Sequence, residues 1–124
     1  YKRQAYIHAE GYPAGEMKHG PLALIEDGMP VVVIAPRDYY YNKTISNMQE
    51  VIARGAKVLL ITNKSTDEIF SENIWQKIEV ENTDDDLLPF LITIPLQKLA
   101  YHSALKKGYD IDKPRNLAKS VTVE

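Results

Sequence analysis

The chain has 124 residues, of which 44% are hydrophobic and 26% charged, with a formal net charge of −2 at pH 7 and no cysteine. This length suffices for one hydrophobic core, and the missing cysteine excludes a disulfide framework, a thiolate zinc site and a Cys nucleophile. The chain lacks the excess of basic residues that is typical of nucleic-acid-binding proteins. Its longest apolar run, residues 29–36, is too short to span a bilayer. We therefore expect a cytoplasmic protein with neither nucleic acid nor membrane as a partner.

The first half of the chain predicts a strand–helix–strand unit. Residues 30–35, PVVVIA, are apolar and β-branched, which indicates a strand buried on both faces, and residues 57–62, KVLLIT, repeat the pattern. Three apolar residues recur between them at helical spacing, namely Ile45, Met48 and Ile52. Gly55 follows where a helix end favours a positive φ. Apolar strands joined by a helix predict a right-handed βαβ unit and a parallel sheet.

Further elements are predicted on both sides of this unit. Residues 5–12, AYIHAEGY, indicate a strand, and residues 75–81, WQKIEVE, alternate like a strand nearer the sheet edge. Residues 65–68, STDE, form a capping box that begins a short helix. Residues 87–107 indicate a long apolar helix that ends at Gly108, with a kink or break at Pro95.

These elements predict an open α/β domain of three or four strands, in which ligands bind at the carboxyl ends of the strands. The segment 12–20 follows the first predicted strand and would be such a loop. Within it, His19 has the side chain best suited to proton transfer near neutral pH, and Gly20 and Pro21 constrain the backbone beside it. The alternative for His19 is a helix-start histidine that bonds the backbone.

Other candidate residues have a functional and an ordinary reading. Lys119, in NLAKS, would become a nucleophilic amine if it were shielded from water, whereas a solvated tail lysine is the alternative. His102 lies within the long helix, where a core or interface histidine is the usual case. The acidic run 82–86, NTDDD, suits the start of a helix better than a metal site. No metal and no cofactor is predicted.

The segments 6–25, YIHAEGYPAGEMKHGPLALI, and 94–124, IPLQKLAYHSALKKGYDIDKPRNLAKSVTVE, resemble the C-terminal end of the glutamine–fructose-6-phosphate aminotransferase family. The resemblance covers essentially the whole chain. It implies a SIS (sugar isomerase) domain, a three-layer αβα sandwich with a parallel, flavodoxin-like sheet. The first strand and first helix of that domain are expected to be missing from this chain.

The resemblance also implies an activity, the synthesis of glucosamine 6-phosphate from fructose 6-phosphate and the amide nitrogen of glutamine. Lys119 resembles the lysine that forms an imine with the open-chain ketose. His19 resembles the histidine that assists ring opening and reaches the site of the neighbouring subunit, which implies a homodimer. Ala118 resembles a backbone contact to the sugar, and Glu16 and Lys18 are candidate substrate-binding residues beside His19.

The chain departs from the family's pattern in three respects. Without cysteine it lacks the glutaminase domain, and the phosphate-binding loop belongs to the other SIS domain, so both domains are expected partners. Arg3 stands where the family has its isomerisation base, a Glu. We therefore expect a partial SIS domain over residues 1–124, with an active-site tail at 109–124 and little or no activity by itself.

Three other functions stay open on the sequence. One is a non-catalytic sugar-phosphate-binding or regulatory module, which would have no need of a reactive lysine in the tail. Another is a dimerisation piece, in which the helix 87–107 and the loop 11–21 form the interface. A nucleotide-binding flavodoxin-like protein is the weakest alternative, because no Gly-rich phosphate loop follows any predicted strand.

Overall fold

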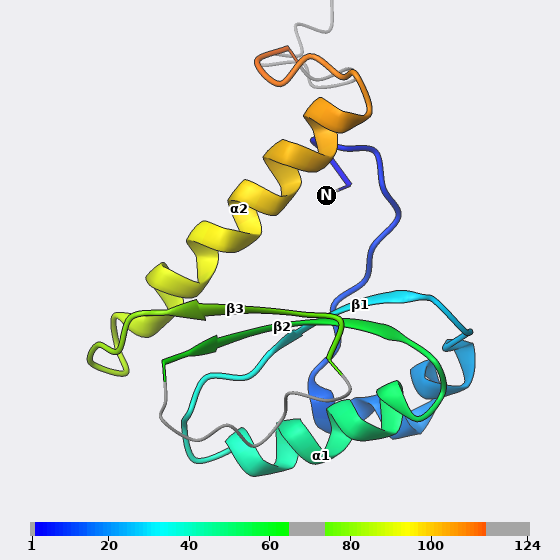
Figure 1. Cartoon of the computed structure of the whole chain (residues 1–124), viewed down its shortest axis with the longest axis vertical. Helices are drawn as coiled ribbons and strands as arrows, with labels where there is room; N and C mark the ends of the chain where they lie inside the picture. The colour runs from blue at the N-terminus through cyan, green and yellow to red at the C-terminus, as the bar shows by residue number, and fades with distance from the viewer. Residues whose placement is uncertain (1, 65–73, 114–124) are drawn as a thin grey trace, which may run out of the picture. The chain divides into compact units, whose positions relative to one another are not determined.

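The computed structural model describes residues 2–64 and 74–113 (Figure 1). In chain order the elements are the short 3₁₀ helices η1 (Ala14–His19) and η2 (Pro21–Leu24), then β1 (Pro30–Ile34), α1 (Tyr41–Ile52), β2 (Lys57–Asn63), β3 (Gln76–Val80) and α2 (Leu88–Lys106). The chain divides into two compact units. One, residues 12–93, holds the sheet and α1; the other combines the described residues up to Gly11 with those from Ile94 onward.

The sheet is parallel throughout and has the order β1-β2-β3. Val32 of β1 is paired with Leu59 of β2, and Ile61 of β2 is paired with Ile78 of β3. The α/β class, the parallel sheet and the strand–helix–strand unit are therefore confirmed, and β3 lies at a sheet edge as its weaker apolar pattern predicts.

One face of the sheet is covered by α1, η1 and η2, which lie on the same side of it (Figure 1). The apolar positions of α1 recur on one face, so Ile45, Met48 and Val51 are buried. They pack with Val58 and Leu60 of β2 into the main hydrophobic core. A fully buried side chain of this size contributes about 1.5–3 kcal/mol, and this core fixes α1 against the sheet.

The prediction that β1 is buried on both faces is wrong. Val31 and Val33 pack against the core on the α1 side, whereas Val32 and Ile34, which point to the opposite face, are 39% and 43% exposed. The prediction holds for β2, whose residues 58–62 are all buried. The difference arises because β1 is an outer strand of the described sheet, while β2 has a neighbour on each side.

The predicted strand at residues 5–12 does not form, since the described sheet contains only β1, β2 and β3. A strand requires a hydrogen-bonding neighbour, and the described residues provide none for this segment. Its backbone also departs from a strand at Tyr6, where φ is +50°. The segment 12–20 is consequently not a loop after a strand; most of it is the helix η1.

The long helix α2 confirms the prediction for residues 87–107, but it continues through Pro95 without a break. Gly108 has a φ of +72°, and the amide of Tyr109 donates to the carbonyl of Ala104, which closes the helix end as expected. The capping box at 65–68 and the helix predicted after it lie outside the described residues.

Candidate functional site

Three consecutive residues at the end of η1 have three different surroundings. Met17 is partly buried and packs against the main core. Lys18 directs its ammonium to Glu50 of α1, with 2.7 Å between Nζ and Oε1. His19 is exposed to solvent. The turn is thus attached to the body of the protein by the two residues that precede the histidine.

The backbone around His19 depends on glycine and proline, as the sequence suggests. The amide of Glu16 donates to the carbonyl of Pro13 at 2.9 Å and closes the first turn of η1. Gly20 follows His19 with a φ of 139°, a conformation that residues with a Cβ rarely adopt. Pro21 then begins η2, whose Leu22 is buried in the core. The exposed histidine therefore lies between Met17, which packs against the core, and Leu22, which is buried in it.

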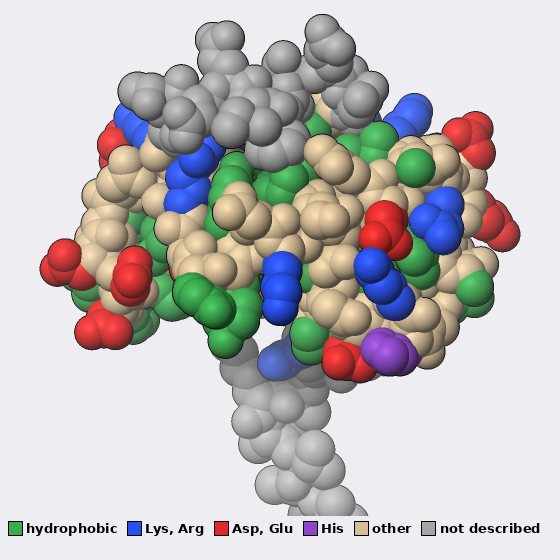
Figure 2. Space-filling model, turned by 90° about the horizontal axis from the view of Figure 1, so that it is seen from below, with side chains coloured by type: hydrophobic (Ala, Val, Ile, Leu, Met, Phe, Trp, Pro, Cys, Tyr) green, Lys and Arg blue, Asp and Glu red, His purple; other side chains and the backbone are tan. Residues whose placement is uncertain are grey.

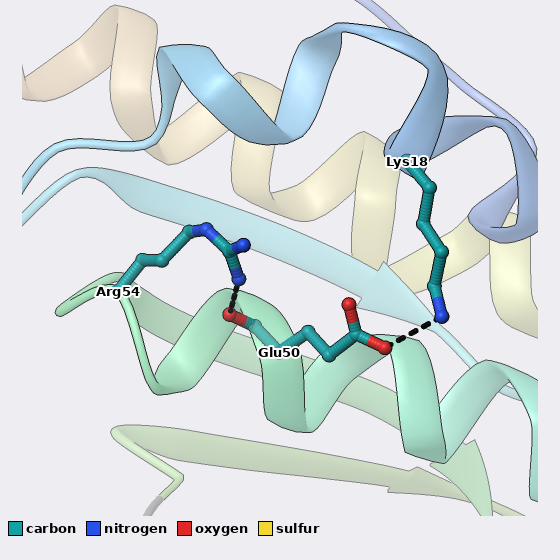
Figure 3. A network of polar contacts seen from close by, with 3 residues as sticks. All are labelled: Lys18, Glu50 and Arg54. Carbon is teal, nitrogen blue, oxygen red and sulfur yellow. Dashed lines mark hydrogen bonds and ion pairs between the residues drawn. The ribbon is translucent and has the colours of Figure 1, made fainter.

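The ion pair between η1 and α1 is shown in Figure 3. Glu50 binds Lys18 through its carboxylate, while its backbone oxygen accepts a hydrogen bond from the Arg54 guanidinium at 2.8 Å. The side chains of Lys18 and Glu50 are 55% and 36% exposed. Sequence reasoning offered Lys18 as a substrate contact and missed Glu50, because nothing local marks a helix residue as the partner of a distant turn.

The structure describes only some of the site residues that the sequence predicts. Glu16, Lys18 and His19 lie in the same short helix, with Glu16 and His19 both exposed. Ala118 and Lys119 lie outside the described residues. Arg3, where the resembled family has a Glu, is exposed in a turn near the start of the chain.

A second polar cluster joins the carboxyl ends of the three strands. The amide of Arg37, after β1, donates to Oδ1 of Asn63 at 2.8 Å, and Nδ2 of Asn63, at the end of β2, donates to Oδ1 of Asn82, after β3, at 2.7 Å. The Arg37 guanidinium lies 4.7 Å from the centre of the Tyr41 ring. Sequence reasoning missed this cluster. The signal was available, because each residue is the first or second polar one beyond a predicted strand.

The remaining candidates show no additional site. His102 is exposed, and its ring meets that of Tyr101 edge to face at 5.2 Å. The backbone oxygen of Asp84 accepts from the amides of Leu87 and Leu88 at the start of α2, as expected for a run that begins a helix. Within the described ranges no three His, Asp or Glu side chains are grouped as metal ligands.

The surface seen from the α1 side carries both signs of charge. Figure 2 shows Lys and Arg side chains interspersed with Asp and Glu rather than gathered by sign. This distribution agrees with the net charge of −2 and differs from the basic stripe of nucleic-acid-binding proteins. No helix in the described part of the chain is long and apolar enough to cross a membrane.

The parallel sheet and its covering helix define a class of protein. The family model of the SIS domain matches residues 1–107, and the chain belongs to this family. One solved structure that is similar to the chain is the "C-terminal domain of glucosamine-fructose-6-phosphate aminotransferase from Francisella tularensis". It shares 47% sequence identity and a TM-score of 0.84, over 90% of this chain and 31% of that one.

The particular relatives are glutamine–fructose-6-phosphate aminotransferases (isomerizing). The chain is 53% identical over 123 residues to the enzyme from Rhizobium meliloti (strain 1021) and 54% identical to that from Brucella abortus biovar 1 (strain 9-941). Each match covers 99% of this chain and 20% of the relative. The chain thus spans about a fifth of the length of the enzymes it matches, and corresponds to the SIS region at their C-terminal end.

Proposed function

We propose that the chain is the C-terminal isomerase part of a cytoplasmic glutamine–fructose-6-phosphate aminotransferase. The observation that carries the proposal is the identity of 53–54% over 99% of the chain. The structure of the segment 6–25 supports it, because His19 is exposed at the end of η1, a helix that packs against the core. In the parent enzyme this part would complete the site that turns fructose 6-phosphate into glucosamine 6-phosphate.

Lys119 and His19 would perform the two chemical tasks of this part. The neutral amine of Lys119 adds to the C2 carbonyl of the open-chain ketose, and loss of water leaves an imine that acidifies the protons on the neighbouring carbon. His19 assists the preceding ring opening, in which a proton leaves the anomeric hydroxyl and another reaches the ring oxygen. An imidazole suits both transfers, because one ring nitrogen can accept a proton while the other donates one.

Other residues and domains would complete the site. Ala118 offers a backbone contact beside Lys119 in the tail 109–124, and Glu16 and Lys18 are candidate sugar contacts on η1. The glutaminase domain, the other SIS domain and a second subunit are the proposed partners, because this chain spans a fifth of its relatives. His19 would then serve the active site of the neighbouring subunit in a homodimer.

The test uses the full-length parent enzyme with and without Lys119→Ala. Borohydride treatment in the presence of fructose 6-phosphate should leave a sugar-phosphate adduct on Lys119, located by peptide mass spectrometry, because reduction traps an imine. Lys119→Ala should abolish glucosamine 6-phosphate formation and leave glutamine hydrolysis largely intact. Lys106→Ala, at the exposed end of α2, is the matched control and should change neither activity.

The other outcomes separate the alternatives. Adducts spread over surface lysines, or the loss of both activities together, would assign the tail a structural role. Binding of the sugar phosphate with no adduct and no turnover in the unsubstituted enzyme would instead favour a non-catalytic SIS module.

A further inference from the structure

The contact between η1 and α1 brings together two segments that are far apart in the chain. Lys18 is the residue directly before His19, and Glu50 lies in the last turn of α1. Their charged groups are 2.7 Å apart, the short distance of a charge-assisted hydrogen bond (Figure 3). The Arg54 guanidinium binds the backbone oxygen of Glu50, whereas the Glu50 carboxylate binds Lys18.

We propose that Glu50 is a positioning residue that holds the His19-bearing turn in place through Lys18. The inference rests on the proposed role of His19 in ring opening. It gives a function to a residue of α1 that makes no contact with the sugar site in the proposed mechanism. It also gives Lys18 a structural role in place of, or besides, the sugar contact offered for it.

Two attachments are needed because one does not determine the orientation of a short helix. Met17 fixes η1 against the core by an apolar contact, which is non-directional. Lys18, the residue after Met17, adds a second contact, the ion pair with Glu50, whose hydrogen-bond geometry is directional. After His19 the backbone passes through Gly20, which is conformationally permissive. The position of the imidazole therefore depends on the residues that precede it as well as on η2, which Leu22 holds in the core.

The expected size of the effect follows from the exposure of the pair. Exposed ion pairs contribute little to global stability, and these two side chains are 55% and 36% exposed. Loss of the pair should therefore leave the fold intact and act on the local turn. A loosened turn should lower kcat by about two- to fivefold, which is the fold-change equivalent to the free energy that one exposed ion pair contributes. The KM for fructose 6-phosphate should change less.

The experiment compares Glu50→Gln with Glu81→Gln in the full-length parent enzyme. Glu81 forms an exposed ion pair with Lys64 beyond β2 and β3, so its substitution removes the same kind of contact elsewhere. Hydrogen exchange of the peptide covering residues 12–24 is measured together with kcat and KM. We expect faster exchange of this peptide and a lower kcat for Glu50→Gln, and neither change for Glu81→Gln.

A charge-reversed pair provides the second variant. Lys18→Glu combined with Glu50→Lys should restore slow exchange of residues 12–24, and each single reversal should not. Unchanged exchange in Glu50→Gln, or no recovery in the reversed pair, would overturn the inference.

The kinetic readout separates this inference from the proposed function. If His19→Asn lowers activity but the faster exchange in Glu50→Gln leaves kcat unchanged, the positioning role is refuted. If His19→Asn has no effect on activity, the proposed role of His19 fails, and hydrogen exchange alone then decides whether Glu50 holds the turn.

Discussion

Gly55 joins α1 to β2 in a backbone conformation that requires glycine. Its φ is +87°, and a Cβ placed there would lie 2.4 Å from Oδ1 of Asp27 and 3.0 Å from the Cα of the same residue. The close approach has a reason, because the carbonyl of Gly55 accepts a hydrogen bond of 2.7 Å from the amide of Gly28. This bond links the turn before β1 to the turn before β2, so Gly55→Ala disturbs both.

The expected cost has two parts. A left-handed conformation costs a residue with a Cβ about 1–2 kcal/mol, and forced overpacking typically adds about 1–3 kcal/mol. The carboxylate of Asp27 can rotate away, whereas its Cα is part of the backbone and moves only with the turn. We therefore expect Gly55→Ala to lower the free energy of unfolding by about 2–5 kcal/mol.

Gly108→Ala isolates the first part of that cost. Gly108 has a similar φ of +72°, but a Cβ there meets nothing within 4 Å, so a loss of about 1–2 kcal/mol is expected. The assay is urea unfolding of the 124-residue chain, followed by far-UV circular dichroism and by the fluorescence of Trp75, its single tryptophan. Equal losses in the two variants would refute the reasoning about Asp27.

Three further predictions concern the core, a buried hydroxyl and the subunit interface. Met48 is 2% exposed in the main core, so Met48→Ala should lower the free energy of unfolding by about 2–5 kcal/mol in the same urea assay. Phe90 is 70% exposed, so Phe90→Ala should change it by no more than about 0.5 kcal/mol. Thr62→Val should leave the melting temperature unchanged or raise it, because Oγ1 of Thr62 is buried with no hydrogen-bond partner among the described residues. A clearly lower melting temperature would instead reveal a hydrogen bond to that oxygen. In the parent enzyme, mixing and reassociating inactive His19→Ala and Lys119→Ala subunits should restore part of the isomerisation rate, and no recovery would place both residues in sites within a single subunit.

Much of the local structure could be predicted from the sequence. Apolar runs and helical spacing located β1, α1, β2 and α2 correctly, and Gly55 and Gly108 have the positive φ that their places after helices indicate. These predictions succeed because the period of the apolar residues and the conformational freedom of glycine act over a few neighbouring residues. The family could also be assigned from the motifs at the two ends of the chain, which the SIS match and the relatives confirm.

The tertiary structure decided the features that depend on a distant neighbour. The sequence of β1 is as apolar as that of β2, yet Val32 and Ile34 are exposed because β1 is an outer strand of the described sheet. Residues 5–12 have the pattern of a strand but lack a described partner to pair with. Lys18 could have met solvent, a ligand or a carboxylate, and the packing of η1 beside α1 selected Glu50. Each outcome depends on which surface lies opposite a residue, a relation that local sequence does not contain.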